Sequence, residues 1–226
     1  MSPRVTGAIV RLSLAALTAF ALAAPARART EETSWSVQLL VGVPFNFPAR
    51  VKIRQEGAPD LRFRGRFATH PFESPWYYGV GAFRRSGGRE WSAELVHHKV
   101  FLENPPPEVQ AFSISHGYNL LLAGLGVEVA PGVWARGAAG AVIAHPESTV
   151  RGRTLPERGG IRGYHLAGPA LSVGLEGRVP MGERLRIALG GRMTAAQATV
   201  PVEGGSARVP NVAFHATAGL AGDLVR

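Results

Sequence analysis

The chain has 226 residues, a formal net charge of +9 and no cysteine. The lack of cysteine excludes a disulfide framework and a lipoprotein anchor. A positive charge of this size in a cytosolic protein would indicate a nucleic-acid partner, whereas an exported protein meets membrane surfaces and lipopolysaccharide phosphate instead.

The N-terminus has the pattern of a secretory signal peptide. Arg4 and Arg11 precede an apolar run from Leu12 to Ala24, and Ala26-x-Ala28 follows as a signal-peptidase site. The apolar run is too short to span a bilayer as a helix. We predict that residues 1–28 are cleaved and that residues 29–226 form one domain (226 − 28 = 198 residues). No later stretch has 18 uncharged apolar residues, so an exported chain of this kind is soluble or a β-barrel, and we expect no nucleic-acid partner.

The mature chain alternates apolar and polar residues with a period of two, which is typical of strands with two unlike faces. Near the start, Trp35, Val37 and Leu39 alternate with Ser36 and Gln38. The five clearest segments are 34–43, 90–101, 170–179, 185–194 and 211–220. Three weaker segments are 76–85, 113–129 and 133–144. The sequence therefore predicts about eight strands.

Short and long connections alternate along the chain. The short ones are 86–89, 130–132 and 180–183, and the long ones are 44–75, 103–111, 145–163 and 201–210. This rhythm is typical of outer-membrane barrels, which have tight periplasmic turns and extended outer loops. We predict an all-β fold, a single closed antiparallel up-and-down transmembrane β-barrel of about eight strands.

The apolar face is expected to point outward, because the polar face carries both signs of charge and many glycines. Such charges can pair inside the narrow bore of an eight-stranded barrel. The polar-face residues are Glu94, Arg136, Glu176, Arg178, Arg186, Arg192 and His215. Aromatic residues near strand ends suit the membrane interface; they are Trp35, Trp76, Tyr77, Trp91 and Trp134. The alternative is a soluble periplasmic lipid-binding barrel with an apolar bore.

With its signal sequence, alternating strands and loop rhythm, the mature chain resembles the small bacterial outer-membrane barrels of the OmpA/OmpX-like class. The resemblance implies an outer-membrane location, contact with outer-membrane lipid and lipopolysaccharide, insertion by the barrel-assembly machinery, and no cofactor. The chain ends in "GDLVR", whereas members of this class usually end in an aromatic residue that the assembly machinery reads.

A histidine-rich stretch lies at the predicted outer rim. If Leu95 points outward, Glu94 and His98 point into the bore, and His116 and Tyr118 are expected to meet them from the next strand. These four residues predict a hydrogen-bonded plug. Two histidines and a carboxylate can bind zinc, but no close-spaced ligand motif is present, and no metal is predicted.

A second, partial resemblance is to the lipid A deacylase barrels, which carry His-x-Ser-Asn. The nearest match here is His116-Gly117-Tyr118-Asn119, with tyrosine at the nucleophile position. Ser115 is expected to face away from His116 unless a bulge near Gly117 changes its direction. The resemblance leaves a lipid A ester hydrolase as an alternative function, without an assigned catalytic residue. Its candidate residues are His98, His116, Ser115, Glu94, Tyr118 and Asn119.

The favoured function is structural or surface-binding: lipopolysaccharide contact, membrane integrity, or adhesion through the outer loops. His97 and Lys99 are expected to point outward at the level of the lipid headgroups. The first long connection alternates basic and apolar residues and predicts a hairpin above the membrane. Its basic residues are Arg50, Lys52, Arg54, Arg62, Arg64 and Arg66.

Overall fold

The computed structural model describes residues 33–156 and 160–225, so the predicted signal peptide (residues 1–28) lies outside the described residues. The strands are β1 (Ser34–Phe47), β2 (Ala49–Gln55), β3 (Leu61–Gly65), β4 (Phe67–Ala68), β5 (Tyr78–Ser86), β6 (Arg89–His97), β7 (Val100–Leu102), β8 (Val109–Ile114), β9 (Tyr118–Ala130), β10 (Val133–Ala144), β11 (Glu147–Val150), β12 (Arg153–Thr154), β13 (His165–Pro180), β14 (Leu185–Val202) and β15 (Gly205–Val225). One short 3-10 helix, η1, covers Gly160–Gly163. Among the described residues, no helix is long and apolar enough to span a membrane.

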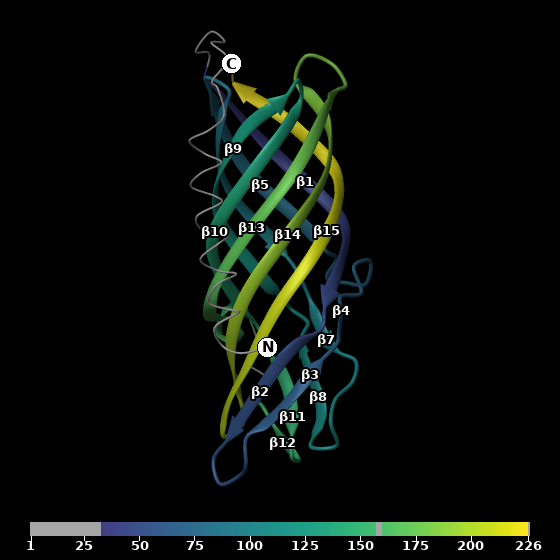
Figure 1. Cartoon of the computed structure of the whole chain (residues 1–226), viewed down its shortest axis with the longest axis vertical. Helices are drawn as coiled ribbons and strands as arrows, with labels where there is room; N and C mark the ends of the chain where they lie inside the picture. Colours follow the sequence, from purple (N-terminus) through teal and green to yellow (C-terminus); the bar gives the residue numbers. More distant parts are fainter. Residues whose placement is uncertain (1–32, 157–159, 226) are drawn as a thin grey trace.

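Eight strands close into a barrel (Figure 1). The order is β1-β5-β6-β9-β10-β13-β14-β15, and β1 also pairs with β15. Every neighbouring pair is antiparallel and follows the order of the chain. The predicted up-and-down barrel is therefore confirmed.

The apolar face of the barrel points outward. In β1, Trp35, Val37 and Leu39 are 47%, 43% and 58% exposed, whereas Ser36 and Gln38 between them are 1% and 3% exposed. The same inversion continues around the wall through Val80, Trp91, Leu121, Leu125, Val173, Leu175, Leu189, Phe214 and Leu220. A continuous apolar outer wall is the arrangement that hydrocarbon requires, so the strands form a transmembrane barrel.

Two of the aromatic residues assigned to the outer face in fact point inward. Tyr77 is 2% exposed, and its hydroxyl lies 2.9 Å from Nδ1 of His215. Trp134 is 6% exposed, and its ring faces the guanidinium of Arg178 at 5.5 Å. The prediction was wrong for Trp134 because it rested on residue type and a place near a strand end, whereas Trp134 shares the bore-facing side of β10 with Arg136, two residues on.

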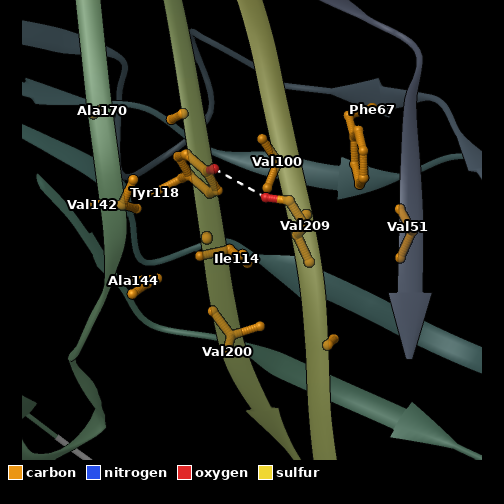
Figure 2. Packing of buried hydrophobic residues seen from close by; sticks show 14 of the residues in the cluster. Val51, Phe67, Val100, Ile114, Tyr118, Val142, Ala144, Ala170, Val200 and Val209 are labelled. Carbon is orange, nitrogen blue, oxygen red and sulfur yellow. Dashed lines mark hydrogen bonds between the residues drawn. The ribbon is translucent and has the colours of Figure 1, made fainter. Parts of the chain in front are cut away.

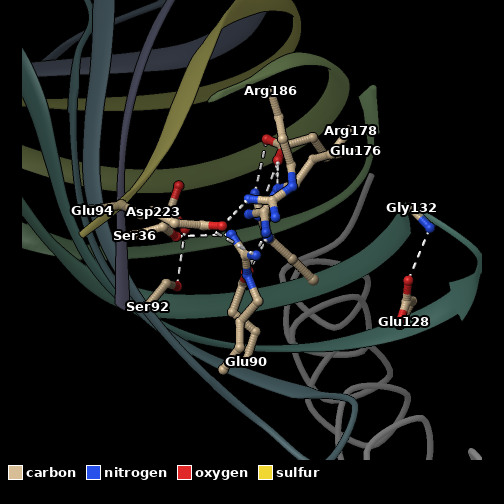
Figure 3. Close-up of polar contacts among 12 residues, drawn as sticks. Ser36, Glu90, Ser92, Glu94, Glu128, Gly132, Glu176, Arg178, Arg186 and Asp223 are labelled. Carbon is tan, nitrogen blue, oxygen red and sulfur yellow. Dashed lines mark hydrogen bonds and ion pairs between the residues drawn. The ribbon is translucent and has the colours of Figure 1, made fainter. Parts of the chain in front are cut away.

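The half of the bore nearer the short turns holds a network of buried ion pairs, which we call the ionic plug (Figure 3). Glu90 accepts hydrogen bonds from Arg136 at 2.7 Å and from Arg178 at 2.7 Å, and Arg85 lies 3.0 Å from the same carboxylate. Arg136 also donates twice to Glu176, at 2.9 and 3.0 Å. The glycines beside these charges provide room: a Cβ added at Gly126 would lie 3.1 Å from the Arg136 side chain. The expected pairing of charges inside the barrel is confirmed.

The outer end of the barrel carries a second unit, the cap. It consists of the β2–β3 hairpin, the outer ends of β14 and β15, and a five-stranded sheet in the order β12-β11-β8-β7-β4 (the lower part of Figure 1). Its apolar core continues into the outer half of the bore (Figure 2). Core residues include Val51, Ile53, Phe67, Val100, Val109, Ile114, Tyr118, Val150, Val200 and Val209. The hairpin was predicted, but the five-stranded sheet within the other connections was not.

The connection predicted at residues 201–210 is strand, not loop. β14 and β15 continue to Val202 and Gly205, and the turn is Glu203–Gly204, with Gly204 at a φ of 70°. Pro201 is tolerated because β14 has lost its β13 partner by this height, after the Ala170–Ala196 pair, so its missing N–H faces a free edge. Pro210 lies where β15 changes partner from β1 to β2.

Candidate functional site

The four residues expected to meet at the rim do not form one cluster. Glu94 accepts a hydrogen bond from Arg192 at 2.9 Å, deep in the ionic plug. His98 is fully buried and its Nε2 lies 3.1 Å from Oδ1 of Asn46, while the Tyr118 hydroxyl donates to the carbonyl of Val209 at 3.1 Å. The rings of His98 and Tyr118 are neighbours, with centroids 6.1 Å apart.

The expected exposure of His97 and Lys99 is wrong. His97 is 5% exposed, stacks on Tyr78 at 5.0 Å and lies 2.7 Å from Oδ1 of Asn119. Lys99 is 1% exposed and donates to the carbonyl oxygen of Glu73 at 2.8 Å. This burial lowers the pKa of the Lys99 amine. β6 ends at His97, and the following residues pack under the first connection, which strand periodicity cannot show.

The β2–β3 hairpin presents a basic face to the outside. Arg50 lies directly opposite Arg64, and Lys52 lies opposite Arg62. Arg208 of β15 pairs with Lys52 on its other side, so one row of three cationic residues crosses three strands. Sequence reasoning missed Arg208 because its segment was interpreted as a loop. We define the basic face as Arg50, Lys52, Arg54, Arg62, Arg64, Arg66 and Arg208.

Asp60 places a carboxylate within this surface. Asp60 is 2.8 Å from Nζ of Lys52, 3.2 Å from Arg62 and 3.8 Å from Arg54. The hydrogen bond from Lys52, together with that from Arg62, holds the pKa of the Asp60 carboxyl below its ordinary value of 3.8. Asp60 is therefore ionised at neutral pH, and it offsets only part of the positive charge.

The basic face continues the lipid-facing wall of the barrel. Phe45 and Phe47 of β1 pair with Phe214 and Val212 of β15 on the outer surface, and the rings of Phe45 and Phe214 stack at 6.4 Å. Arg208 projects from the same side of β15 four residues beyond Val212, a distance of about 13 Å along the strand. The order from the apolar wall through an aromatic girdle to cationic residues is that of a membrane–water interface.

A different polar cluster forms beside the barrel rim, and we call it the rim cluster: Ser115, His116, His145, Glu147 and Tyr164. Oε1 of Glu147 lies 2.6 Å from Nδ1 of His116 and 2.8 Å from Oγ of Ser115, which is itself 3.1 Å from Nδ1 of His116. The His116 and His145 rings are 5.0 Å apart. Sequence reasoning missed His145, Glu147 and Tyr164, because they lie in or directly after the long connection predicted at residues 145–163.

The expected facing of Ser115 and His116 is wrong because the chain is not a continuous strand there. β8 ends at Ile114 and β9 begins at Tyr118, with Gly117 between them at a φ of 138°. This conformation favours glycine and breaks the alternation of faces. Residues 115–117 are outside any strand, so strand alternation does not hold there, and His116 is exposed with its Nδ1 3.1 Å from Oγ of Ser115.

These contacts do not build a hydrolase relay. In a Ser–His–acid relay, the carboxylate and the nucleophile occupy different ring nitrogens of the histidine. Here Ser115 and Glu147 both contact Nδ1 of His116. The Tyr118 hydroxyl, at the position where the deacylase motif has serine, is buried and donates to a backbone carbonyl.

No protein-family model and no curated protein sequence matches the chain. Three solved structures with a similar fold are Neisserial surface protein A, outer membrane protein AlkL and outer membrane protein OprG from Pseudomonas aeruginosa. They are 11%, 10% and 10% identical, with TM-scores of 0.44, 0.46 and 0.41. The alignments cover 85%, 90% and 87% of this chain and 99%, 96% and 98% of those chains, respectively.

The class of the protein follows from its own geometry. A closed antiparallel barrel with an apolar outer wall, a polar inner half and short turns at one end is an integral outer-membrane β-barrel. Beyond the barrel, the described residues add the cap and, beside the lipid-facing wall, the basic face.

Proposed function

We propose that this outer-membrane barrel binds the phosphate groups of lipopolysaccharide through its basic face. One observation carries the proposal: the cationic residues lie on the same outer wall as the lipid-facing residues, directly beyond the aromatic girdle of Phe45, Phe47 and Phe214. Lipid standing against the wall therefore has its headgroup at the height of the basic face.

The energetics suit multivalent contact with an anionic surface. A basic residue near such a surface contributes about 1 kcal/mol of attraction, which falls off within a Debye length. Most of the basic face is exposed, and the cross-strand pairs Arg50–Arg64 and Lys52–Arg62 place like charges next to each other. Like charges opposite one another destabilise a strand pair; Asp60 offsets this at Lys52 and Arg62, and a bound phosphate would add a further counter-charge to the face.

The first prediction concerns charge reversal on the basic face. The double variant Arg50→Glu/Arg64→Glu should weaken lipopolysaccharide binding about tenfold at low salt, because two exposed attractive contacts become repulsive. Binding is measured with the signal-free barrel folded in neutral detergent and titrated with labelled lipopolysaccharide. The wild-type affinity should fall as salt is added.

The matched control carries the same change in net charge at the opposite end of the barrel. Arg84 and Arg89 are exposed near the β5–β6 turn, and Arg84→Glu/Arg89→Glu should leave the affinity unchanged. An equal loss in both double variants would mean that net charge alone attracts the lipid, and the proposed face would be wrong. Lipopolysaccharide without its phosphate groups should bind weakly to both proteins, with the same affinity for the wild type as for the Arg50→Glu/Arg64→Glu variant.

The second prediction concerns the carboxylate within the face. Asp60→Asn removes one negative charge and frees Lys52 and Arg62, so the affinity for lipopolysaccharide should rise roughly two- to fivefold. Because the pKa of Asp60 is lowered, the wild-type carboxylate stays charged throughout the range from about pH 5 to 8. The gain should therefore be constant over this range, and a gain that vanished toward pH 5 would contradict the assignment.

A further inference from the structure

The rim cluster brings together a ligand set suited to a transition-metal cation. One nitrogen each of His116 and His145 and one carboxylate oxygen of Glu147 all lie within 4.8 Å of one another. Two imidazoles and a carboxylate form a common three-residue protein ligand set for zinc, with a fourth position left for water or another ligand. In a tetrahedral site with bonds of about 2.0 to 2.1 Å, the ligand atoms are about 3.3 Å apart, so no pair of ligand atoms has to close by more than about 1.5 Å.

The backbone around the cluster already holds these residues in place. The amide of His145 donates to the carbonyl of Gly117 at 3.1 Å, which ties the segment bearing His145 and Glu147 to the one bearing His116. The Tyr164 hydroxyl donates to the carbonyl of His116 at 2.9 Å. These bonds lie between segments far apart in the sequence, and they leave the closing movement to side-chain torsions.

The side chains are free to make that movement. The side chains of His116 and Glu147 are 54% and 40% exposed, so rotation about their torsions meets water on one side. His145 is 6% exposed and packs against Tyr164 with ring centroids 5.1 Å apart, and it forms the fixed part of the set. Ser115 donates to the Glu147 carboxylate at 2.8 Å, which is the kind of outer contact that orients a metal-binding carboxylate.

We propose that His116, His145 and Glu147 bind a divalent transition-metal cation, with Zn²⁺ as the best match, at the outer rim of the barrel. The open coordination position faces the outside, because the two exposed ligands form the solvent side of the cluster. Ser115 is a positioning residue that holds Glu147 toward the metal. The site is separate from the basic face and does not depend on lipopolysaccharide binding.

The test is a zinc titration of the tag-free barrel folded in detergent at neutral pH, read by competition with a chromophoric chelator. The wild type should bind one Zn²⁺ per chain. His116→Ala and Glu147→Gln should each weaken binding at least about tenfold, and Ser115→Ala should weaken it by a smaller factor. X-ray absorption of the loaded protein should show two imidazoles in a shell of nitrogen and oxygen at about 2.0 Å.

The matched control is another exposed histidine–carboxylate pair. Nδ1 of His70 lies 3.0 Å from Oε1 of Glu73, and their side chains are 42% and 71% exposed. His70→Ala should leave zinc affinity unchanged. Each variant is first shown to fold by its heat-modifiable mobility in SDS gels. His145 is buried; if His145→Ala does not fold, the variants at the more exposed residues His116 and Glu147 provide the test. Absence of zinc binding in the wild type, or equal binding by wild type and His116→Ala, would overturn the proposal.

Discussion

Replacing Glu90 with glutamine should destabilise the barrel by about 3–5 kcal/mol, the cost of breaking a buried ion pair on one side. Glu90 is 1% exposed and its carboxylate contacts Arg85, Arg136 and Arg178 within 3.0 Å. The amide of glutamine has nearly the same size, so packing is retained and the guanidinium groups lose a shared counter-charge. Urea-induced unfolding in detergent or lipid vesicles, followed by tryptophan fluorescence, measures the change.

The control for this variant is a glutamate whose ion pair is exposed. Glu73→Gln removes the contact with His70 on the outer surface, and an exposed pair contributes at most about 1 kcal/mol. A loss for Glu90→Gln no larger than that for Glu73→Gln would show that the ionic plug does not stabilise the barrel. Folding of both variants should be checked at low denaturant before the transitions are compared.

The second large effect is expected in the cap. Ile53→Ala should cost about 2–5 kcal/mol of local stability, because Ile53 is fully buried in the cap core and the substitution leaves a cavity. Ile53 pairs with Ala207 of β15 beyond Val212, where the β1–β15 pairing has ended, so the cap should open while the membrane-spanning part of the barrel stays folded. Limited proteolysis should then cleave the β2–β3 hairpin faster, while the barrel keeps its resistance to SDS.

An exposed position on the same hairpin provides the comparison. Arg64 lies on the outer side of β3, and Arg64→Ala should leave the cleavage rate within about twofold of the wild type, since surface substitutions usually change stability by less than about 0.5 kcal/mol. If Ile53→Ala also abolished SDS resistance, the cap and the barrel would unfold as one cooperative unit and not as two separate ones.

The barrel was predictable because alternation is a local property. Trp35, Val37 and Leu39 reveal a two-faced strand within a few residues, and the charges on the opposite face show which side hydrocarbon touches. The same logic found the β2–β3 hairpin and six of the basic residues. The prediction failed for Trp134, which was placed by residue type although it lies on the same side of its strand as the bore-facing Arg136.

The cap and the rim cluster depend on contacts between distant segments. Ile114 ends one short strand, and β8 pairs with both β7 and β11 to form the outer sheet. Nothing local to these short segments specifies that pairing, and the prolines nearby indicate loops. His116 and Glu147 are 31 positions apart, so their proximity follows only once the cap is assembled. The sequence allows a bulge near Gly117, and in the structure the chain does leave the strand conformation between β8 and β9, where His116 lies.

The unusual length of β14 and β15 has a mechanical consequence. These strands have 18 and 21 residues, and at about 3.3 Å per residue the shorter is roughly 60 Å long, about twice the thickness of a bilayer's hydrocarbon layer. A hairpin hydrogen-bonded along its whole length is a stiff beam rather than a tether. The cap is therefore held at a fixed height and orientation above the bilayer.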